Sequence, residues 1–172
     1  MMSARAVMVF AVMSVWLLGC PLGWAQPYSA TEQAELAKAL KDVNVSLAKA
    51  LTTSEREGQP ISGKFELEEG KLQLSVYTMK GNAFSEVIVD HVTGKIAKVE
   101  PITGGEDLTA AKAQAEAMAK AKRALPEVVD AAVKTYPGFR AVSIVPAMKG
   151  HAVAEITLVK DGAFTTITES LD

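Results

Sequence analysis

Two stretches of this chain match each other at an offset of 80 positions without a gap, and this repeat limits the possible folds more than any other feature. The matched positions are glycines at expected turns and apolar residues between them: Gly58 with Gly138, Gly70 with Gly150, Val76 with Ile156, Ala83 with Ala163, and Phe84 with Phe164. Self-similarity at a fixed offset is typical of one structural unit made twice. The repeat therefore predicts two related halves, but it names no reaction.

Helical segments precede strands in the first half. Ser29-Ala30-Thr31-Glu32 has the spacing of a capping box, which predicts a helix from there to Leu40. Asn44 or Ser46 can cap a second short helix that reaches Leu51. Alternating apolar residues and turn glycines then predict four strands, at residues 61–68, 72–79, 83–90 and 95–99.

The second half has the same order. An alanine- and lysine-rich stretch at residues 110–123 predicts a helix, and Pro126 fits the first turn of another. Strands are expected near residues 139–147, 153–160 and 163–169, with two-residue turns at Gly81-Asn82 and Asp161-Gly162. The predicted fold class is α+β, built from two repeated helix-then-antiparallel-meander modules.

The first 25 residues have the pattern of a signal peptide. Arg5 precedes an apolar run of about 12 residues, too short to cross the membrane comfortably. Small residues at Gly23 and Ala25 predict cleavage before Gln26. Alternatively, Leu17 to Cys20 resembles a bacterial lipobox, and Cys20 would then carry a lipid anchor. The protein is therefore expected in the periplasm or secreted, with a membrane-anchored lipoprotein as the alternative.

After residues 1–25, the chain divides into one module at residues 26–100, a linker at 101–105 and a second module at 106–172. Cys20 is the only cysteine, so no disulfide is possible within the chain. The net charge of −2 offers little attraction to a phosphate backbone, which argues against nucleic acid as a partner. No segment after the leader is long and apolar enough to predict a transmembrane span.

The run Val89-Asp90-His91-Val92-Thr93-Gly94-Lys95-Ile96, together with the preceding helix and the strand around Val76, resembles the PepSY domain family. Asp90, Thr93, Gly94 and Lys95 match the D-x-x-T-G-K turn of that family, and the resemblance covers about residues 44–100. It implies a cystatin-like module of exported proteins, which also occurs in the propeptides of secreted metallopeptidases. The second half matches less well, because the chain ends at Asp172, where a second such turn would follow.

Each candidate site residue has a structural interpretation as well as a functional one. Asp90 can bind a partner or cap its own turn, and the second interpretation is favoured. His91 and His151 occupy different positions in the two halves, so a shared metal site is not expected. Glu66 and Glu68 are interpreted as a solvated strand face. The matched aromatics Phe84 and Phe164 are expected to pack against helices rather than to form a recognition platform.

No nucleophile–base pair, metal cluster or phosphate loop can be named, so catalytic, metal and cofactor residues are all predicted to be absent. The sequence thus favours a non-enzymatic exported module that binds an envelope or secreted protein, with a peptidase as the partner class that the resemblance implies. In that role it would modulate or inhibit the peptidase. A carrier of a small ligand held between the two modules is the alternative.

Overall fold

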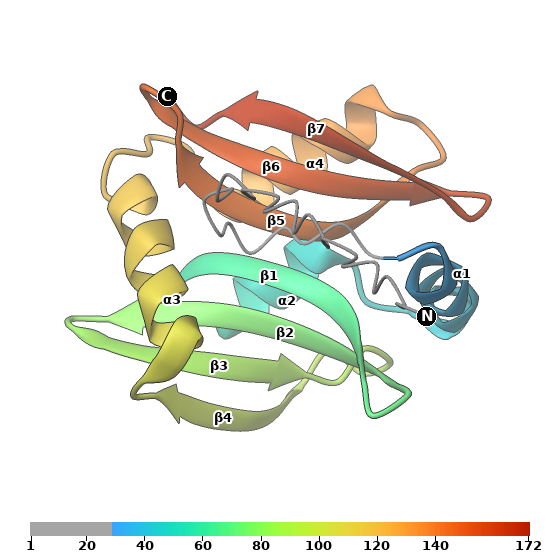
Figure 1. Cartoon of the computed structure of the whole chain (residues 1–172), viewed down its shortest axis with the longest axis horizontal. Helices are drawn as coiled ribbons and strands as arrows, with labels where there is room; N and C mark the ends of the chain where they lie inside the picture. The colour runs from blue at the N-terminus through green and yellow to red at the C-terminus, as the bar shows by residue number, and fades with distance from the viewer. Residues whose placement is uncertain (1–28) are drawn as a thin grey trace, which may run out of the picture.

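A single seven-stranded antiparallel sheet forms the centre of the molecule, in the strand order β4-β3-β2-β1-β5-β6-β7 (Figure 1). The computed structural model describes residues 29–172. The seven strands are β1 Gln59–Glu68, β2 Lys71–Lys80, β3 Ala83–Val89, β4 Ile96–Ile102, β5 Arg140–Met148, β6 Ala152–Lys160 and β7 Ala163–Ser170. The predicted leader at residues 1–25, with Cys20, lies outside the described residues.

The prediction of two repeated helix-and-meander modules is wrong as a description of the fold. β1 and β5 pair in antiparallel fashion, with Gly63 opposite Ile144 and Lys64 opposite Ser143, and this pairing joins both sets of strands into one sheet. Separate meanders would each expose β1 or β5 as an edge, whereas pairing these two strands removes two open edges at once. Residues 101–105, predicted as a linker, include the end of β4 and the first residue of α3.

Side-chain caps begin both helices of the first half. The predicted capping box is present at α1 (Ala30–Ala39), where Ser29 and Glu32 each accept the other's backbone N–H. After the short 3-10 helix η1 (Leu40–Asp42), Ser46 caps α2 (Leu47–Ser54) by accepting the N–H of Lys49. These caps satisfy backbone donors that a helix start would otherwise leave unpaired.

Two-residue turns with left-handed backbone close three of the hairpins. Gly70 and Gly162 have φ of +76° and +82°. The preceding residues, Glu69 and Asp161, also have positive φ, which is the pattern of type I′ turns. Gly81 has φ +62° while Asn82 does not have positive φ, as in a type II′ turn. The glycines in the sequence thus fixed these hairpins and their registers.

Helices cover both faces of the sheet. Figure 1 shows α3 (Gly105–Met118) in front of the strands, and α2 and α4 (Leu125–Thr135) behind them. The neighbouring residues Ser62 and Gly63 of β1 show the same division. The buried hydroxyl of Ser62 donates to Gln114 of α3 at 2.6 Å, whereas a Cβ on Gly63 would touch Leu51 and Leu47 of α2.

The main core lies between the sheet and the pair α2 and α4. It contains fully buried residues from both halves, including Leu47, Leu51, Phe65, Ile144 and Ile156. Because both halves contribute to one core across the β1–β5 pairing, the described chain is one folding domain. Within residues 29–172, no helix has both the length and the apolar character needed to cross a bilayer.

Candidate functional site

The Asp90–Lys95 turn joins β3 to β4 and is held by its own side chains. Asp90 Oδ1 accepts the backbone N–H of Thr93 at 2.7 Å and that of Val92 at 2.9 Å. These hydrogen bonds lower the pKa of Asp90, with the bond from Thr93 the largest cause. Gly94 adopts φ +73°, which a side chain would strain. The carboxylate of Asp90 thus caps this turn.

This turn also anchors the segment that leads into α2. The carbonyl of His91 accepts the N–H groups of both Asn44 and Val45 at 3.1 Å. His91 Nδ1 is buried and has no hydrogen-bond partner in the described part of the chain, although the side chain as a whole is only partly buried. His151 is exposed in the loop between β5 and β6, so the fold places the two histidines in different loops.

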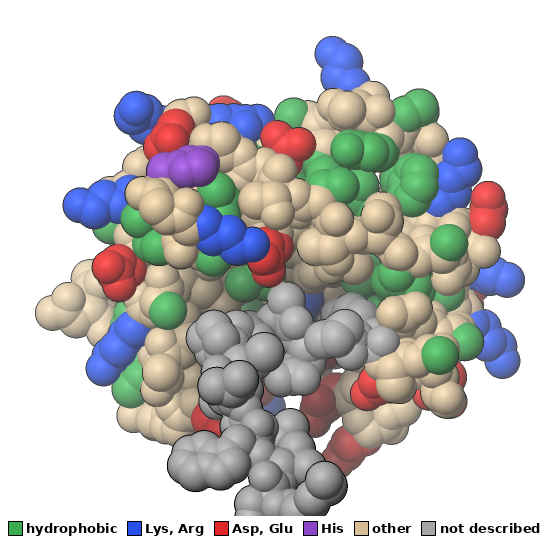
Figure 2. Space-filling model, turned by 45° about the horizontal axis from the view of Figure 1, so that its top comes forward, with side chains coloured by type: hydrophobic (Ala, Val, Ile, Leu, Met, Phe, Trp, Pro, Cys, Tyr) green, Lys and Arg blue, Asp and Glu red, His purple; other side chains and the backbone are tan. Residues whose placement is uncertain are grey.

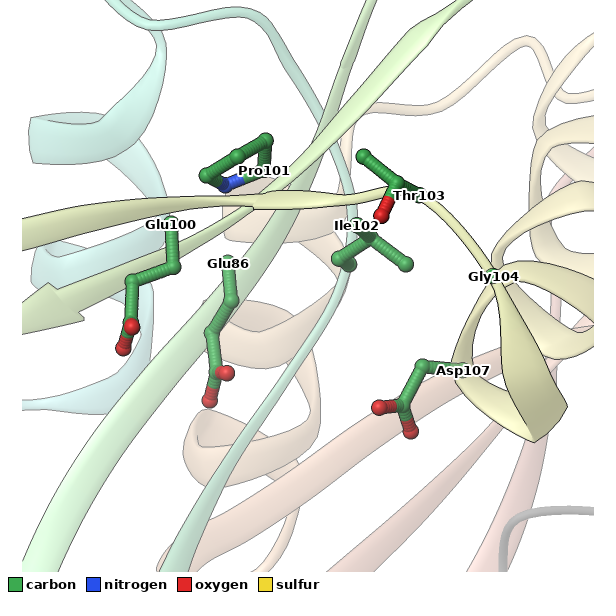
Figure 3. A pocket seen from close by; sticks show the side chains of 7 residues that line it. All are labelled: Glu86, Glu100, Pro101, Ile102, Thr103, Gly104 and Asp107. Carbon is green, nitrogen blue, oxygen red and sulfur yellow. The ribbon is translucent and has the colours of Figure 1, made fainter.

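Three carboxylates line an open pocket of about 400 Å³ beside the β3–β4 edge (Figure 3). Glu86 comes from β3, Glu100 from β4 and Asp107 from the first turn of α3, and none of the described residues that line the pocket is basic. Glu100 forms an ion pair with Lys98 at 2.8 Å. Nowhere in residues 29–172 are three His, Cys, Asp or Glu side chains arranged to hold a metal ion.

A polar network occupies the α3 side of β1, β2 and β3. Lys64 forms an ion pair with Glu66 at 2.5 Å, and the fully buried Ser75 donates to Glu66 at 3.1 Å. Gln73 donates to Ser75 at 3.0 Å. Glu66 therefore does not lie on a freely solvated strand face, as the alternation suggested, because its side chain is partly buried and its carboxylate bonds to Lys64 and Ser75. Sequence alternation gives the face of a residue but not what covers it.

Tyr77 lies at the centre of this polar network and is 7% exposed. Its hydroxyl donates to Glu86 at 3.4 Å, and the Lys64 ammonium lies 5.7 Å from its ring centroid. Burial raises the pKa of Tyr77 strongly, and the nearby charges of Glu66, Glu86 and Asp107 raise it further. A neutral, buried phenol of this kind supports the sheet but is poorly suited to act as a base.

One edge of the sheet, β4, is poorly suited to accept a further strand. The β2–β3 hairpin closes at Lys80 and Ala83, so alternation directs Val99 and Pro101 of β4 outward. Pro101 has no N–H to donate at that edge. Lys98 and Glu100 add charge, and the register is irregular at Val89. Proline, charge and irregular register are devices that block edge-to-edge pairing.

The opposite edge, β7, has none of these features between Ala163 and Thr168, a run without charge or proline. The β6–β7 hairpin closes at Lys160 and Ala163, so alternation turns the backbone groups of Thr166 and Thr168 outward. Within residues 29–172, no hydrogen bond reaches the backbone N–H or C=O of these two threonines from the outward side. Both side chains are exposed. β7 is therefore an open edge, which no sequence motif had marked.

The matched phenylalanines differ in their surroundings. Phe84 is 8% exposed and belongs to the core, opposite Met79 in the β2–β3 register. Phe164 is only partly buried, opposite Val159 near the start of β7. The fold thus places one of them in an inner hairpin and the other on the open edge strand.

Charged side chains of both signs are scattered over the face shown in Figure 2, without a continuous basic patch. Comparison with known proteins gives no match: no family model, no curated protein and no solved structure is significantly similar to this chain.

Proposed function

We propose that this protein is a non-catalytic binding module that adds an extended segment of another exported protein as a further strand beside β7. In strand addition, main-chain hydrogen bonds supply affinity, and side chains on alternate faces supply specificity. The supporting observation is the contrast between the two sheet edges. β4 carries proline, charge and an irregular register, whereas β7 offers the bare backbone groups of Thr166 and Thr168.

The partner class that we propose is an envelope or secreted peptidase, because the Asp90–Lys95 turn resembles that of the PepSY family. An extended peptide segment of the partner suits a β7 edge with uncharged threonines at its outward positions. Residues 1–25 carry the pattern of an export signal, which would bring the module into the same compartment.

A ligand carrier with its site between the halves finds no supporting observation. The halves meet through the β1–β5 strand pairing, with Gly63 opposite Ile144, and through contact between α2 and α4. The acidic pocket of Figure 3 lies within the first half and its junction with α3. Strand addition is therefore the function that we retain.

Affinity capture from an envelope extract tests this proposal. The bait is the exported protein, and the variant is Thr166→Pro, which removes one outward N–H without touching the hydrogen bonds to β6. The matched control is Val99→Pro, which makes the same change at an outward position of β4. Circular dichroism and a thermal melt establish that both variants fold.

We expect wild type and the Val99→Pro control to retain the same partner, identified by mass spectrometry, and Thr166→Pro to lose it. If the partner has peptidase activity, its rate should fall on titration with wild type and not with Thr166→Pro. Equal capture by both proline variants would rule out β7 as the binding edge. The absence of any specifically retained protein would contradict the binding function itself.

A further inference from the structure

The open part of β7 has a definite end on the side of Ser170. Arg123 donates to the carbonyl of Ser170 at 2.7 Å, and the N–H groups of Lys122 and Arg123 both bond to the carbonyl of Leu171. The loop after α3 therefore covers the last outward position of the strand. At the other end, the chain turns away at Asp161-Gly162. The open stretch runs between these two limits, and Thr166 lies near its middle.

We propose that a second copy of this chain pairs with this stretch, β7 against β7 in antiparallel fashion, on a two-fold axis at Thr166. In this register, Thr166 of each copy lies opposite the same residue of the other, and the two exchange both backbone hydrogen bonds. Their outward N–H and C=O groups have no partner within the described chain. The seven-stranded sheet would then continue across the axis into the sheet of the second copy.

Charge favours this antiparallel pairing of two copies. The two-fold axis brings Arg123, at one end of the open stretch, close to Asp161 of the second copy, at the other end. Glu169 falls opposite Ala163 of the second copy, so no like charges face each other. A parallel in-register pairing would instead put Glu169 beside Glu169 and Arg123 beside Arg123. The antiparallel register thus avoids these like-charge neighbours and leaves Arg123 at 4.0 Å from Glu169 of its own copy.

The contact would be small, because it uses one edge strand from each copy, and small interfaces are typically weak and reversible. A weak dimer would cover β7 at high protein concentration and release it to a partner at low concentration. The dimer uses the same edge as the proposed function but does not depend on it, since no third protein takes part.

Disulfide trapping tests the register. In a protein that carries Cys20→Ser, Thr166→Cys places two cysteines opposite each other across the axis, at a Cα separation of about 5.5 Å that a disulfide can bridge. Thr168→Cys is the matched control on the same strand and face. The cysteines at position 168 of the two copies would lie four residues apart along the strands, about 13 Å, which a disulfide cannot bridge.

We expect mild oxidation to give a covalent dimer with Thr166→Cys and monomer with Thr168→Cys. Sedimentation equilibrium should show concentration-dependent dimer for wild type, and Thr166→Pro should weaken it by about tenfold through the loss of its hydrogen bonds. Monomer at every concentration, or equal trapping at both positions, would overturn the proposal. Since the capture experiment does not require a dimer, this failure is distinguishable from failure of the proposed function.

Discussion

Both terminal nitrogens of the Arg140 guanidinium donate to the carbonyl oxygen of Val43, at 3.3 Å and 3.2 Å. One of them also donates to the carbonyl of Leu40 at 3.0 Å. Arg140 begins β5, whereas Leu40 and Val43 belong to the segment between α1 and α2. This single side chain therefore joins the two halves at a further point, besides the β1–β5 strand pairing, the Ser62–Gln114 hydrogen bond and the contact between α2 and α4.

Arg140→Ala should lower the free energy of unfolding by about 2 kcal/mol, because it removes charge-assisted hydrogen bonds and leaves two partly buried carbonyls without their donor. The stability of Arg140→Lys should lie between those of wild type and Arg140→Ala, since an ammonium cannot reproduce the planar, forked guanidinium. Urea unfolding measures both. Arg56→Ala is the control, because Arg56 is exposed and, among residues 29–172, pairs only with its neighbour Glu57. Equal stabilities of the two alanine variants would contradict a stabilising role for the Arg140 hydrogen bonds.

Gly58→Ala should destabilise the protein by about 1–3 kcal/mol, for a steric reason. An added Cβ would lie 2.7 Å from the backbone oxygen of Met79, which belongs to a strand and cannot move away cheaply. At Gly104 nothing lies within 4 Å of the corresponding position, so Gly104→Ala should cost less than about 1 kcal/mol. Chemical denaturation checks the difference, and a larger loss at Gly104 would refute the packing argument.

Stability should fall with rising pH above about 10 because of Tyr77. The raised pKa keeps this phenol protonated in the folded protein while the unfolded chain loses the proton, so folding becomes less favourable by up to about 1.4 kcal/mol per pH unit. Tyr77→Phe has no proton to lose and should show a shallower decline. Urea midpoints between pH 9 and 11.5 give the comparison, and identical slopes for the two proteins would disprove it.

Asp90→Ala should lower the melting temperature by about 2–4 °C at pH 7, since Val92 and Thr93 lose their acceptor. Because the pKa of Asp90 is lowered in the folded state, its contribution is present above the unfolded value and is lost as pH falls through the folded value. The difference between wild type and variant should therefore shrink as the pH is lowered below the ordinary pKa of an aspartate. Asp90→Asn keeps an acceptor oxygen and should melt closer to wild type. A pH-independent difference would argue against the carboxylate as the cap.

Local features of this fold could be predicted from the sequence, because their causes lie within a few residues. Ser29 and Ser46 cap helices by bonding three residues ahead, and Gly70 and Gly162 allow turns that side chains would strain. The aligned glycines Gly58 and Gly138 are nevertheless required for different reasons. Gly138 has φ +85°, whereas a side chain at Gly58 would collide with the carbonyl of Met79. The same residue type at matched positions does not imply the same physical requirement.

Long-range features could not be predicted. Nothing near Gly63 or Ile144 indicates that these residues face each other, because either strand could equally have been a sheet edge. The alanine-rich sequence of α3 has no strong apolar face, so its position opposite α2 and α4 could not be inferred. The open edge at β7 follows from the order of the strands in the sheet, so it could not be predicted either.

The β1–β5 pairing has a consequence for how the chain reaches its fold. Its partners are about 80 residues apart, while two-residue turns close the hairpins β1–β2, β2–β3 and β6–β7. Contacts between distant residues carry a larger entropic cost of loop closure, so they tend to form late. We expect the hairpins to form first and the β1–β5 pairing to form last. Until then, β1 and β5 are unpaired strand edges, and the folding chain is at its most vulnerable to aggregation during that interval.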